Sequence, residues 1–256
     1  MAAHADDISD FVNGPAKPKK SGGRFTLFRL LTFIGILVLL IALLLPLSRG
    51  SRGAARRAQC VNNLKQIALA LDNYERTYNA LPPAYTVDAA GKPLHSWRTL
   101  ILPYLEQRSL YETIDLSKSW NDPVNAKAYA KDVEAFRCPE LNRPCHTTYL
   151  AVVASNSCFL PDEPRRLADV SDDRGLTLSV IEASLDQAVH WMAPTDADES
   201  LVMGLTPRSK LSHSGGTNAA FLDGGIHFLK ATSPSPQRRA MISIAGSDDK
   251  AAGIRD

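Results

Sequence analysis

The sequence has little net charge and lacks the short motifs that mark common enzyme sites. Lysine and arginine exceed aspartate and glutamate by two in 256 residues, so no overall electrostatic attraction to nucleic acid is expected. No phosphate-binding loop, glycine-rich dinucleotide turn or nucleophile elbow occurs. We therefore expect a protein that is not an enzyme, requires no cofactor and has no nucleic-acid partner.

Cysteine is also scarce. The four cysteines all follow the apolar N-terminal segment, at Cys60, Cys138, Cys145 and Cys158, and their spacing matches no zinc-binding pattern. Four cysteines allow three sets of disulfide pairs, and the residues alone do not choose among them. Free buried thiols are the alternative.

The longest apolar stretch runs from Leu30 to Leu47, 18 residues without a charge. As a helix it is about 27 Å long, close to the hydrocarbon thickness of a bilayer. A cleaved signal peptide is the alternative, but its apolar part usually spans about 7–15 residues and ends in a small-residue cleavage site. This run ends in Pro46-Leu47-Ser48-Arg49 instead. We predict one transmembrane helix over residues 25–47, with membrane lipid as a partner.

Polar segments flank this run. Residues 1–24 include two prolines and three glycines and have few large apolar side chains, so a disordered tail is predicted. Basic residues stand on both sides of the run, so charge alone does not orient the helix. The group after it lies within about three helical turns of the predicted membrane exit, where we expect contact with lipid headgroups. This group is Arg49, Arg52, Arg56 and Arg57.

A second, amphipathic helix is predicted over residues 48–81, continuing the anchor as one long rod, straight or kinked. Its apolar positions recur at steps of three and four residues: Val61, Leu64, Ile67, Ala68, Leu71, Tyr74 and Tyr78. The opposite face is polar: Asn62, Asn63, Lys65, Gln66, Asp72, Asn73 and Arg76. Pro82-Pro83 ends the helix.

Residues 82–246 have the pattern of an α+β domain, and residues 247–256 that of a second disordered tail. Helical spacing predicts two short pieces within Ser96–Tyr111 and a helix from Pro123 to about Lys131, capped by Asp122. Short β-branched or apolar runs predict four strands: Tyr149–Ala154, Leu176–Ala183, Asn218–Leu222 and Ile226–Leu229.

The last two predicted strands flank Asp223-Gly224, a signal for a two-residue type I′ hairpin, so the sheet is expected to be antiparallel. A two-residue loop pairs Phe221 with Ile226 and puts both on the core face. His227 is then expected on the outer face.

The ordered set of these blocks resembles a known bacterial family. The blocks are ALLLP, ARRAQCVNNLKQIALALDNYERTYNALPPAY, SWRTLILPYLEQRSLY, FRCPE, TYLAVVA, and His213 followed nine residues later by Asp223-Gly224. From about Phe25 to Ser243 the chain looks like the prepilin-like family of unknown function whose C-terminal signature is H-x9-DG.

This resemblance implies a pilin-like α+β fold, with the long N-terminal helix packed on a small antiparallel sheet. It implies an inner-membrane protein with a cytoplasmic N-terminus and a periplasmic or extracellular domain. The implied partners are copies of itself, other pilin-like subunits, and a secretion or pilus machine. In that oxidising compartment Cys60 and Cys138 become the first candidate disulfide pair.

The leading functional hypothesis is a membrane-anchored, non-enzymatic, pilin- or pseudopilin-like envelope protein that presents its domain for assembly or partner contact. One alternative is a tethered ligand-binding or sensor module. Another is a metal-dependent hydrolase, for which the candidate residues are His213, Asp223, His227, Asp172 and Asp173. We expect no metal at these residues. A structural role for His213 is favoured instead, such as capping a backbone group or bonding Asp223.

The chain departs from the prepilin pattern at the cleavage site, and this generates a prediction. Arg24 stands where the peptidase needs a glycine, and Arg29 stands where a processed pilin carries a glutamate. That glutamate would neutralise the amine of a processed neighbour, whereas an arginine repels it. We expect the protein to remain an uncut single-pass anchor that does not polymerise as a standard pilin. Intact-mass spectrometry of the purified chain should therefore show no new N-terminus at Phe25. Finding that N-terminus would show that the protein is processed.

Overall fold

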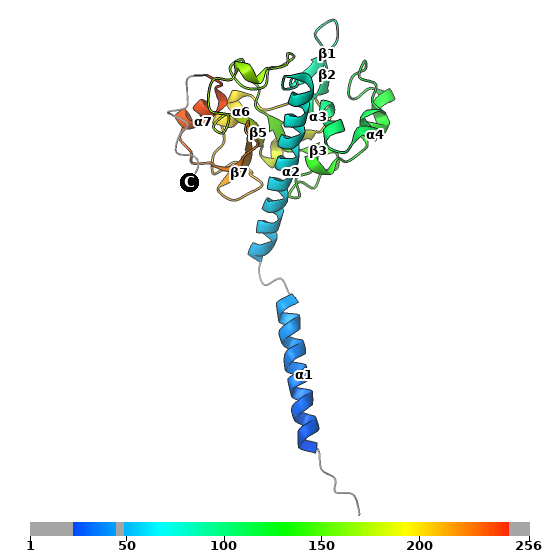
Figure 1. The fold of residues 1–256 in the computed structure, drawn as a ribbon, viewed down its shortest axis with the longest axis vertical. Helices are drawn as coiled ribbons and strands as arrows, with labels where there is room; N and C mark the ends of the chain where they lie inside the picture. The colour runs from blue at the N-terminus through cyan, green and yellow to red at the C-terminus, as the bar shows by residue number, and fades with distance from the viewer. Residues whose placement is uncertain (1–22, 45–48, 246–256) are drawn as a thin grey trace, which may run out of the picture. The chain divides into compact units, whose positions relative to one another are not determined.

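The structure, a computed structural model, describes residues 23–44 and 49–245 (Figure 1). The chain divides into two compact units, Met1–Ser51 and Arg52–Asp256. The predicted tails lie outside the described residues, except that Gly23 and Arg24 belong to a helix. The junction of the two predicted N-terminal helices, at 45–48, also lies outside.

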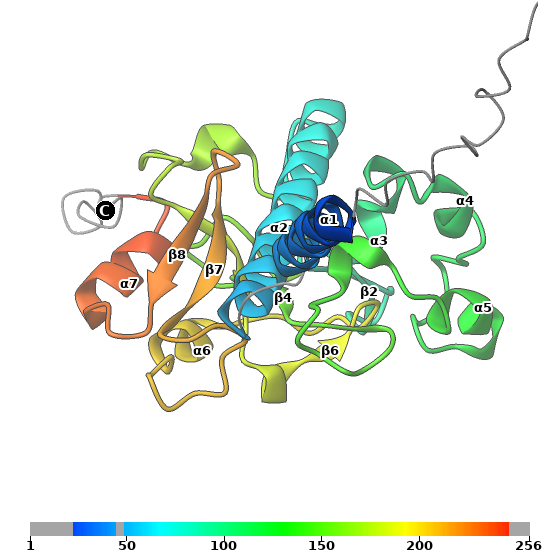
Figure 2. The ribbon, with the colours of Figure 1, turned by 90° about the horizontal axis from the view of Figure 1, so that it is seen from below.

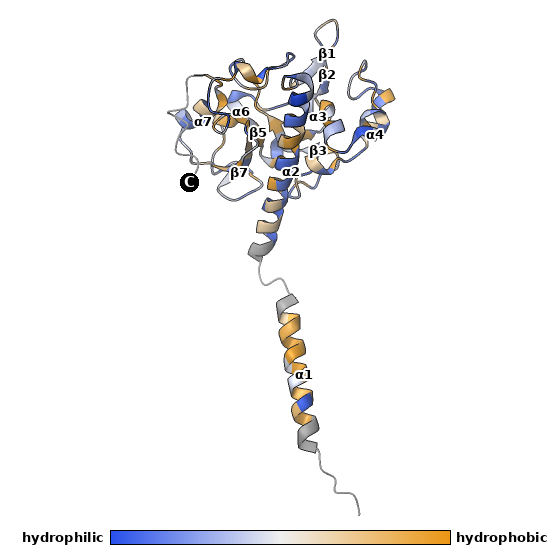
Figure 3. Cartoon of the chain, viewed as in Figure 1, coloured by the Kyte–Doolittle hydropathy of each residue, from blue (hydrophilic) through white to orange (hydrophobic). Residues whose placement is uncertain are grey.

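In the first unit the structure describes helix α1 (Gly23–Leu44). All side chains from residue 27 to residue 42 are exposed, and most are apolar, as the orange colour of α1 in Figure 3 shows. Among the described residues, no helix is long and apolar enough to cross a membrane. The transmembrane span predicted over 25–47 extends past the end of α1 into residues that the structure does not describe.

Helix α2 (Arg49–Tyr78) forms one wall of the core of the second unit. Leu64, Ile67, Ala68 and Leu71 of the predicted apolar face are buried. Cys60, which was not assigned to that face, is buried as well, whereas Tyr78 at its end is 60% exposed. Asn63 was predicted on the polar face, but it is 3% exposed. It is buried because its side-chain amide donates a 2.8 Å hydrogen bond to the carbonyl of Arg137.

A four-stranded antiparallel sheet lies against α2, with the strand order β4-β5-β7-β8. The strands are β4 (Tyr149–Ala151), β5 (Leu178–Glu182), β7 (Gly216–Phe221) and β8 (Ile226–Lys230). All four were predicted near these positions, and the α+β class with small antiparallel sheets is confirmed. Strand β4 is shorter than predicted because Val152 and Val153 form only isolated bridges.

The sheet separates two apolar clusters. Along β4, Tyr149 and Ala151 pack in the cluster that contains α2, whereas Leu150 packs in the second cluster, as the two-residue period of a strand requires. Helices α6 (Glu199–Met203) and α7 (Ser235–Ile242) contribute to the second cluster. The sheet is therefore covered on both faces, which explains why its strands read as largely apolar runs.

The hairpin between β7 and β8 differs from the prediction. The pairs are Ala220 with Ile226 and Ala219 with His227, one residue away from the predicted register. The loop has three residues, because the N–H of Phe221 bonds to the carbonyl of Gly225 at 2.8 Å. A one-residue shift reverses the faces, so Phe221 and Ile226 pack in opposite clusters. His227 lies against the Phe221 ring, at 5.2 Å between centroids.

Short elements complete the domain. They are β1 (Tyr85–Val87), β2 (Pro93–Ser96), α3 (Trp97–Leu100), η1 (Leu102–Tyr104), α4 (Arg108–Tyr111), η2 (Pro123–Asn125), α5 (Ala126–Tyr129), η3 (Glu134–Phe136), β3 (His146–Thr147), η4 (Leu167–Asp169), η5 (Leu185–Gln187) and β6 (Val189–His190). The predicted cap Asp122 is confirmed, since its carboxylate accepts a 3.0 Å bond from the N–H of Val124. Figure 2 shows α4 and α5 on the side of α2 away from β7 and β8.

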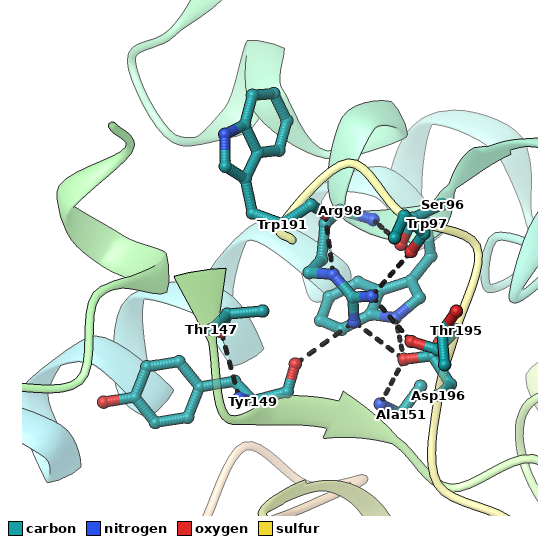
Figure 4. A network of polar contacts seen from close by, with 10 residues as sticks. Ser96, Trp97, Arg98, Thr147, Tyr149, Ala151, Trp191, Thr195 and Asp196 are labelled. Atoms are coloured by element: carbon teal, nitrogen blue, oxygen red, sulfur yellow. Dashed lines mark hydrogen bonds and ion pairs between the residues drawn. The ribbon is translucent and has the colours of Figure 1, made fainter. Parts of the chain in front are cut away.

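A buried arginine connects these layers (Figure 4). Arg98 is 0% exposed, and its guanidinium has five N–H groups to satisfy. It donates five hydrogen bonds of 2.7 to 3.1 Å. The acceptors are the backbone carbonyls of Tyr149, Trp191, Ala193 and Thr195 and the carboxylate of Asp196.

The carboxylate of Asp196 is shared with two further donors. Its Oδ1 accepts 2.9 Å bonds from the indole N–H of Trp97 and from the backbone N–H of Ala151. The network thus joins α3, β4 and the loop that follows β6. Each of these segments depends on the others for hydrogen bonds that water does not supply in the interior.

This network generates a prediction. Replacing Arg98 with methionine should lower the free energy of unfolding by about 3–5 kcal/mol, because Asp196 and several carbonyls lose a buried partner. Arg108→Met is the control, since Arg108 pairs with Glu112 while 78% of its side chain is exposed, and exposed pairs contribute little. Urea denaturation of the purified chain measures both. Similar losses in the two variants would contradict the role assigned to Arg98.

Candidate functional site

A cluster of chemically reactive side chains is buried between α2 and the sheet. Cys60 comes from α2, Cys138 from the segment after η3, Glu182 from the end of β5, and His213 from the turn before β7. Cys60, Cys138 and Glu182 are 0% exposed and His213 is 7% exposed. Four distant parts of the chain therefore bring two thiols, a carboxylate and an imidazole to one place; these four residues are called the thiol–carboxylate cluster.

The atoms of this cluster lie close together. The two sulfur atoms of Cys60 and Cys138 are 3.8 Å apart, and the Cys138 thiol donates a 3.3 Å bond to Oε1 of Glu182. Nε2 of His213 lies 3.2 Å from Oε2 of Glu182. That contact lacks hydrogen-bond alignment, so Nε2 is buried without a hydrogen-bond partner.

Neighbouring polar groups fix the position of Glu182. The amide of Asn218 donates a 2.9 Å bond to Oε2, and the hydroxyl of Thr217 bonds to the backbone carbonyl of Glu182. On the α2 side, Asn63 also reaches the hydroxyl of Tyr149 at 3.4 Å. The carboxylate is thereby held in a defined orientation at the cluster.

The environment shifts the acidities of these groups in opposite directions. The hydrogen bond to Cys138, together with burial, raises the pKa of Cys60 well above its usual value. The same hydrogen bond lowers the pKa of Cys138, so Cys138 is the thiol that ionises first. Burial opposes ionisation of Glu182, yet the contacts with His213 and Asn218 hold its pKa below the usual value. Burial and the charge of Glu182 raise the pKa of Tyr149.

Asp223 was predicted as one candidate partner of His213, but in the structure the neighbour of His213 is Glu182. Asp223 is exposed at the hairpin and its Oδ1 accepts a bond from the N–H of Gly225. Asp172 is buried and Asp173 is exposed. Within the described residues, the side chains that come close enough together to hold a metal ion are those of Cys60, Glu182 and His213. The set His213, Asp223 and His227 is not brought together there.

The structure places Cys60 and Cys138, the candidate disulfide pair, in contact. Their sulfur separation of 3.8 Å is longer than a disulfide bond of about 2.05 Å, and both are free thiols here, as are Cys145 and Cys158. The disulfide stays a prediction. Cys158 is fully buried elsewhere, with its thiol donating to the carbonyl of Leu178 at 3.3 Å.

Of the four arginines expected at lipid headgroups, two contact residues of the domain in the structure. Arg56 forms a 2.8 Å ion pair with Glu140, and the guanidinium of Arg57 lies 3.8 Å from the centre of the Phe228 ring. Both thus bind groups of the domain itself. Arg52 is exposed, and the structure does not describe the side chain of Arg49. The headgroup contact stays a prediction.

A groove of about 450 Å³ lies beside the C-terminal half of α2. Its lining includes Lys65, Asp72 and Arg76 of α2, together with Arg174 and the hairpin residue Asp223. It also contains apolar side chains such as Leu69 and Leu222. The Asp-Gly pair of the C-terminal motif therefore borders a surface groove, while the histidine of the same motif is buried in the thiol–carboxylate cluster.

Glu182 was missed by the sequence reasoning. The signal available was an acidic residue ending the apolar run LSVIE of β5, since a glutamate in a buried strand requires a partner. Asp196 was missed as well, and no periodic pattern marked it because it lies in a loop.

Comparison with known proteins gives one partial match. Residues 50–144 match the model of a family described as a protein of unknown function (DUF1559). No curated protein and no solved structure matches the chain. The matched segment includes Cys60 and Cys138 but not Glu182, nor the motif that begins at His213.

The hairpin of the motif generates a prediction. Gly224 has a φ of +85° with open space around it, so Gly224→Ala should cost about 1–2 kcal/mol from the left-handed backbone alone. Gly224→Asn should cost less, because asparagine tolerates this conformation. Gly53→Ala in α2 is the control and should raise the stability. Gly53 is helical with open space around it, and alanine favours a helix more than glycine does. Urea denaturation measures these changes. If Gly224→Ala and Gly224→Asn are equally stable, the left-handed backbone assigned to Gly224 is contradicted.

Proposed function

We propose that this protein is a membrane-anchored, pilin- or pseudopilin-like component of the bacterial envelope, without enzymatic activity. Its N-terminus is cytoplasmic, the apolar segment over 25–47 is anchored in the inner membrane, and the domain is periplasmic or extracellular. The domain serves assembly or contact with a partner.

The observation that carries this proposal is the packing of α2. A helix of 30 residues buries the face that includes Leu64, Ile67 and Leu71 in the same apolar cluster as the sheet residues Tyr149 and Val180. A long N-terminal helix embedded by one face in an antiparallel sheet domain is what the prepilin resemblance implies. The apolar side chains of α1, exposed from residue 27 to 42, fit a lipid environment better than water.

The packing also limits how the protein assembles. Self-association through the face formed by Val61, Leu64, Ile67 and Leu71 would have favoured assembly, but most of that face is buried within the domain. The face that is free to meet another protein is the outward one, where Leu69 is 60% exposed. Lys65 and Gln66 stand beside it and are exposed as well.

A second candidate function is a tethered ligand-binding or sensor module, and the groove beside α2 favours it. The groove combines apolar side chains with charges of both signs, such as Arg76 and Glu75. A concave surface with a few polar groups is the usual form of a small-molecule site.

The test of the membrane and surface proposal uses cells that produce the full chain. The protein should remain in the membrane pellet after alkaline extraction, and external protease should remove the domain once the outer membrane is permeabilised. Arginine substitutions at Leu37 and Leu40 in α1 should release it, because each charge in the apolar core costs about 2.5–3.5 kcal/mol. A wild-type protein that stays in the soluble fraction would overturn the proposal.

Photo-crosslinking distinguishes assembly from the sensor alternative. A crosslinking residue at Gln66, which is exposed and does not line the groove, should capture a second copy or a partner of the envelope. The same residue at Ile67, which is 0% exposed, is the matched control and should capture only the chain itself. An absence of crosslinks from Gln66, with small solutes binding to the groove, would favour the sensor module.

A further inference from the structure

The thiol–carboxylate cluster contains ligand types suited to a metal ion. One ligand atom each of Cys60, Glu182 and His213 lies within 4.8 Å of the other two. Thiolate, imidazole and carboxylate donors together suit zinc. Calcium and magnesium prefer oxygen ligands alone, so they do not fit this donor set.

The separations can be compared with those of a tetrahedral site. In such a site two sulfur ligands lie about 3.8 Å apart, a sulfur and an oxygen about 3.6 Å apart, and a nitrogen and an oxygen about 3.4 Å apart. The separations here are 3.8 Å between the sulfur atoms of Cys60 and Cys138, and 3.2 Å between Nε2 of His213 and Oε2 of Glu182. The thiol of Cys138 lies 3.3 Å from the other carboxylate oxygen, Oε1. Cys60, Glu182 and His213 form the mutual set. Cys138 lies outside this set, so its thiol has to move toward the other three ligands to complete a tetrahedral site.

The unpaired nitrogen of His213 points to a ligand independently. Nε2 is buried and has no hydrogen-bond partner, although Oε2 of Glu182 is 3.2 Å away. A buried polar atom without a partner is costly. A cation about 2.1 Å from both atoms would bind the nitrogen lone pair and the carboxylate at once.

The ligand set is anionic and favours a cation. Zinc binds cysteine as the thiolate, so the two thiolates and the Glu182 carboxylate would more than neutralise a divalent ion and leave one net negative charge. Without the ion these groups would have no cation to compensate them, which is costly in the interior. The amide of Asn218, at 2.9 Å from Oε2, orients the carboxylate in the way that outer partners orient metal ligands.

We propose that Cys60, Glu182 and His213, with Cys138 as the fourth ligand, form a structural zinc site that fixes α2 to the sheet. The ligands come from four segments that meet only in the folded domain, so binding and folding are coupled. The histidine of the H-x9-DG motif is thereby assigned a role as a ligand. The site does not depend on the membrane anchor or on assembly.

The test uses the purified, reduced full-length chain, with Zn²⁺ and Co²⁺ as probes. We expect one equivalent of zinc per chain by elemental analysis. The Co²⁺ form should show the intense visible bands of a tetrahedral ion together with thiolate-to-cobalt charge transfer. These spectra report the ligands in the unmodified protein, so they are informative even where a variant fails to fold.

Variants identify the ligands. Glu182→Gln and His213→Gln should each weaken zinc binding by at least about tenfold, since even outer partners of a metal contribute about 10–100-fold. Cys60→Ser should remove charge transfer from the Co²⁺ spectrum in part, because Cys138 remains. Chelation should lower the thermal midpoint of the wild type more than that of these variants.

Matched controls are available in the same domain. Cys158→Ser changes a buried thiol that bonds to the carbonyl of Leu178. His190→Gln changes a buried histidine whose Nε2 lies 3.0 Å from the carbonyl of Tyr129. Both should bind zinc as the wild type does.

Three results would overturn the proposal. They are the absence of zinc binding by the reduced protein, an octahedral Co²⁺ spectrum without charge transfer, and a Cys60–Cys138 disulfide in the protein as isolated from cells. The last result would assign the two thiols to a covalent link instead.

Discussion

The domain depends on one buried charge. The guanidinium of Arg98 has no contact with water and finds all five of its acceptors in the loop and strand segments around it. A buried arginine is stable only when every N–H is paired. The short helix α3, strand β4 and the loop that carries Asp196 must therefore take up their positions together, and the face of β4 that meets α2 is set by the same arrangement.

The contact between α2 and the sheet combines two kinds of interaction. Leu64 and Ile67 supply apolar burial, which is large but has no preferred direction. Cys60, Glu182 and His213 add polar groups in the same interface, and these lie at defined distances from one another. Polar groups in an apolar interface specify one register of the helix, because any slip leaves them without partners. The proposed zinc site would fix the register of α2 on the sheet more firmly. The outer face of α2 and the groove beside it stay available for other molecules.

Much of the fold was predictable because it depends on local patterns. The face of α2 followed from the steps of three and four residues, and the four strands followed from short apolar runs. The Asp122 cap followed from its position before Pro123. The hairpin register did not follow, because Asp223-Gly224 fits both a two-residue and a three-residue loop. The choice between them depends on which residues of β7 and β8 pack in each cluster, and Phe221 and Ile226 pack on opposite sides.

The sequence by itself determined the apolar N-terminal segment, the amphipathic helix and the antiparallel strands, since each is encoded by the spacing of neighbouring residues. It also marked His213 and the pair Cys60 and Cys138 as residues of interest. Only the tertiary structure decided that Glu182 joins them and that Asp223 does not. It likewise decided that Asn63 is buried and that Arg98 is the centre of a network. The physical reason is that these contacts join residues tens of positions apart, where burial and hydrogen-bond geometry, and not local spacing, select the partner.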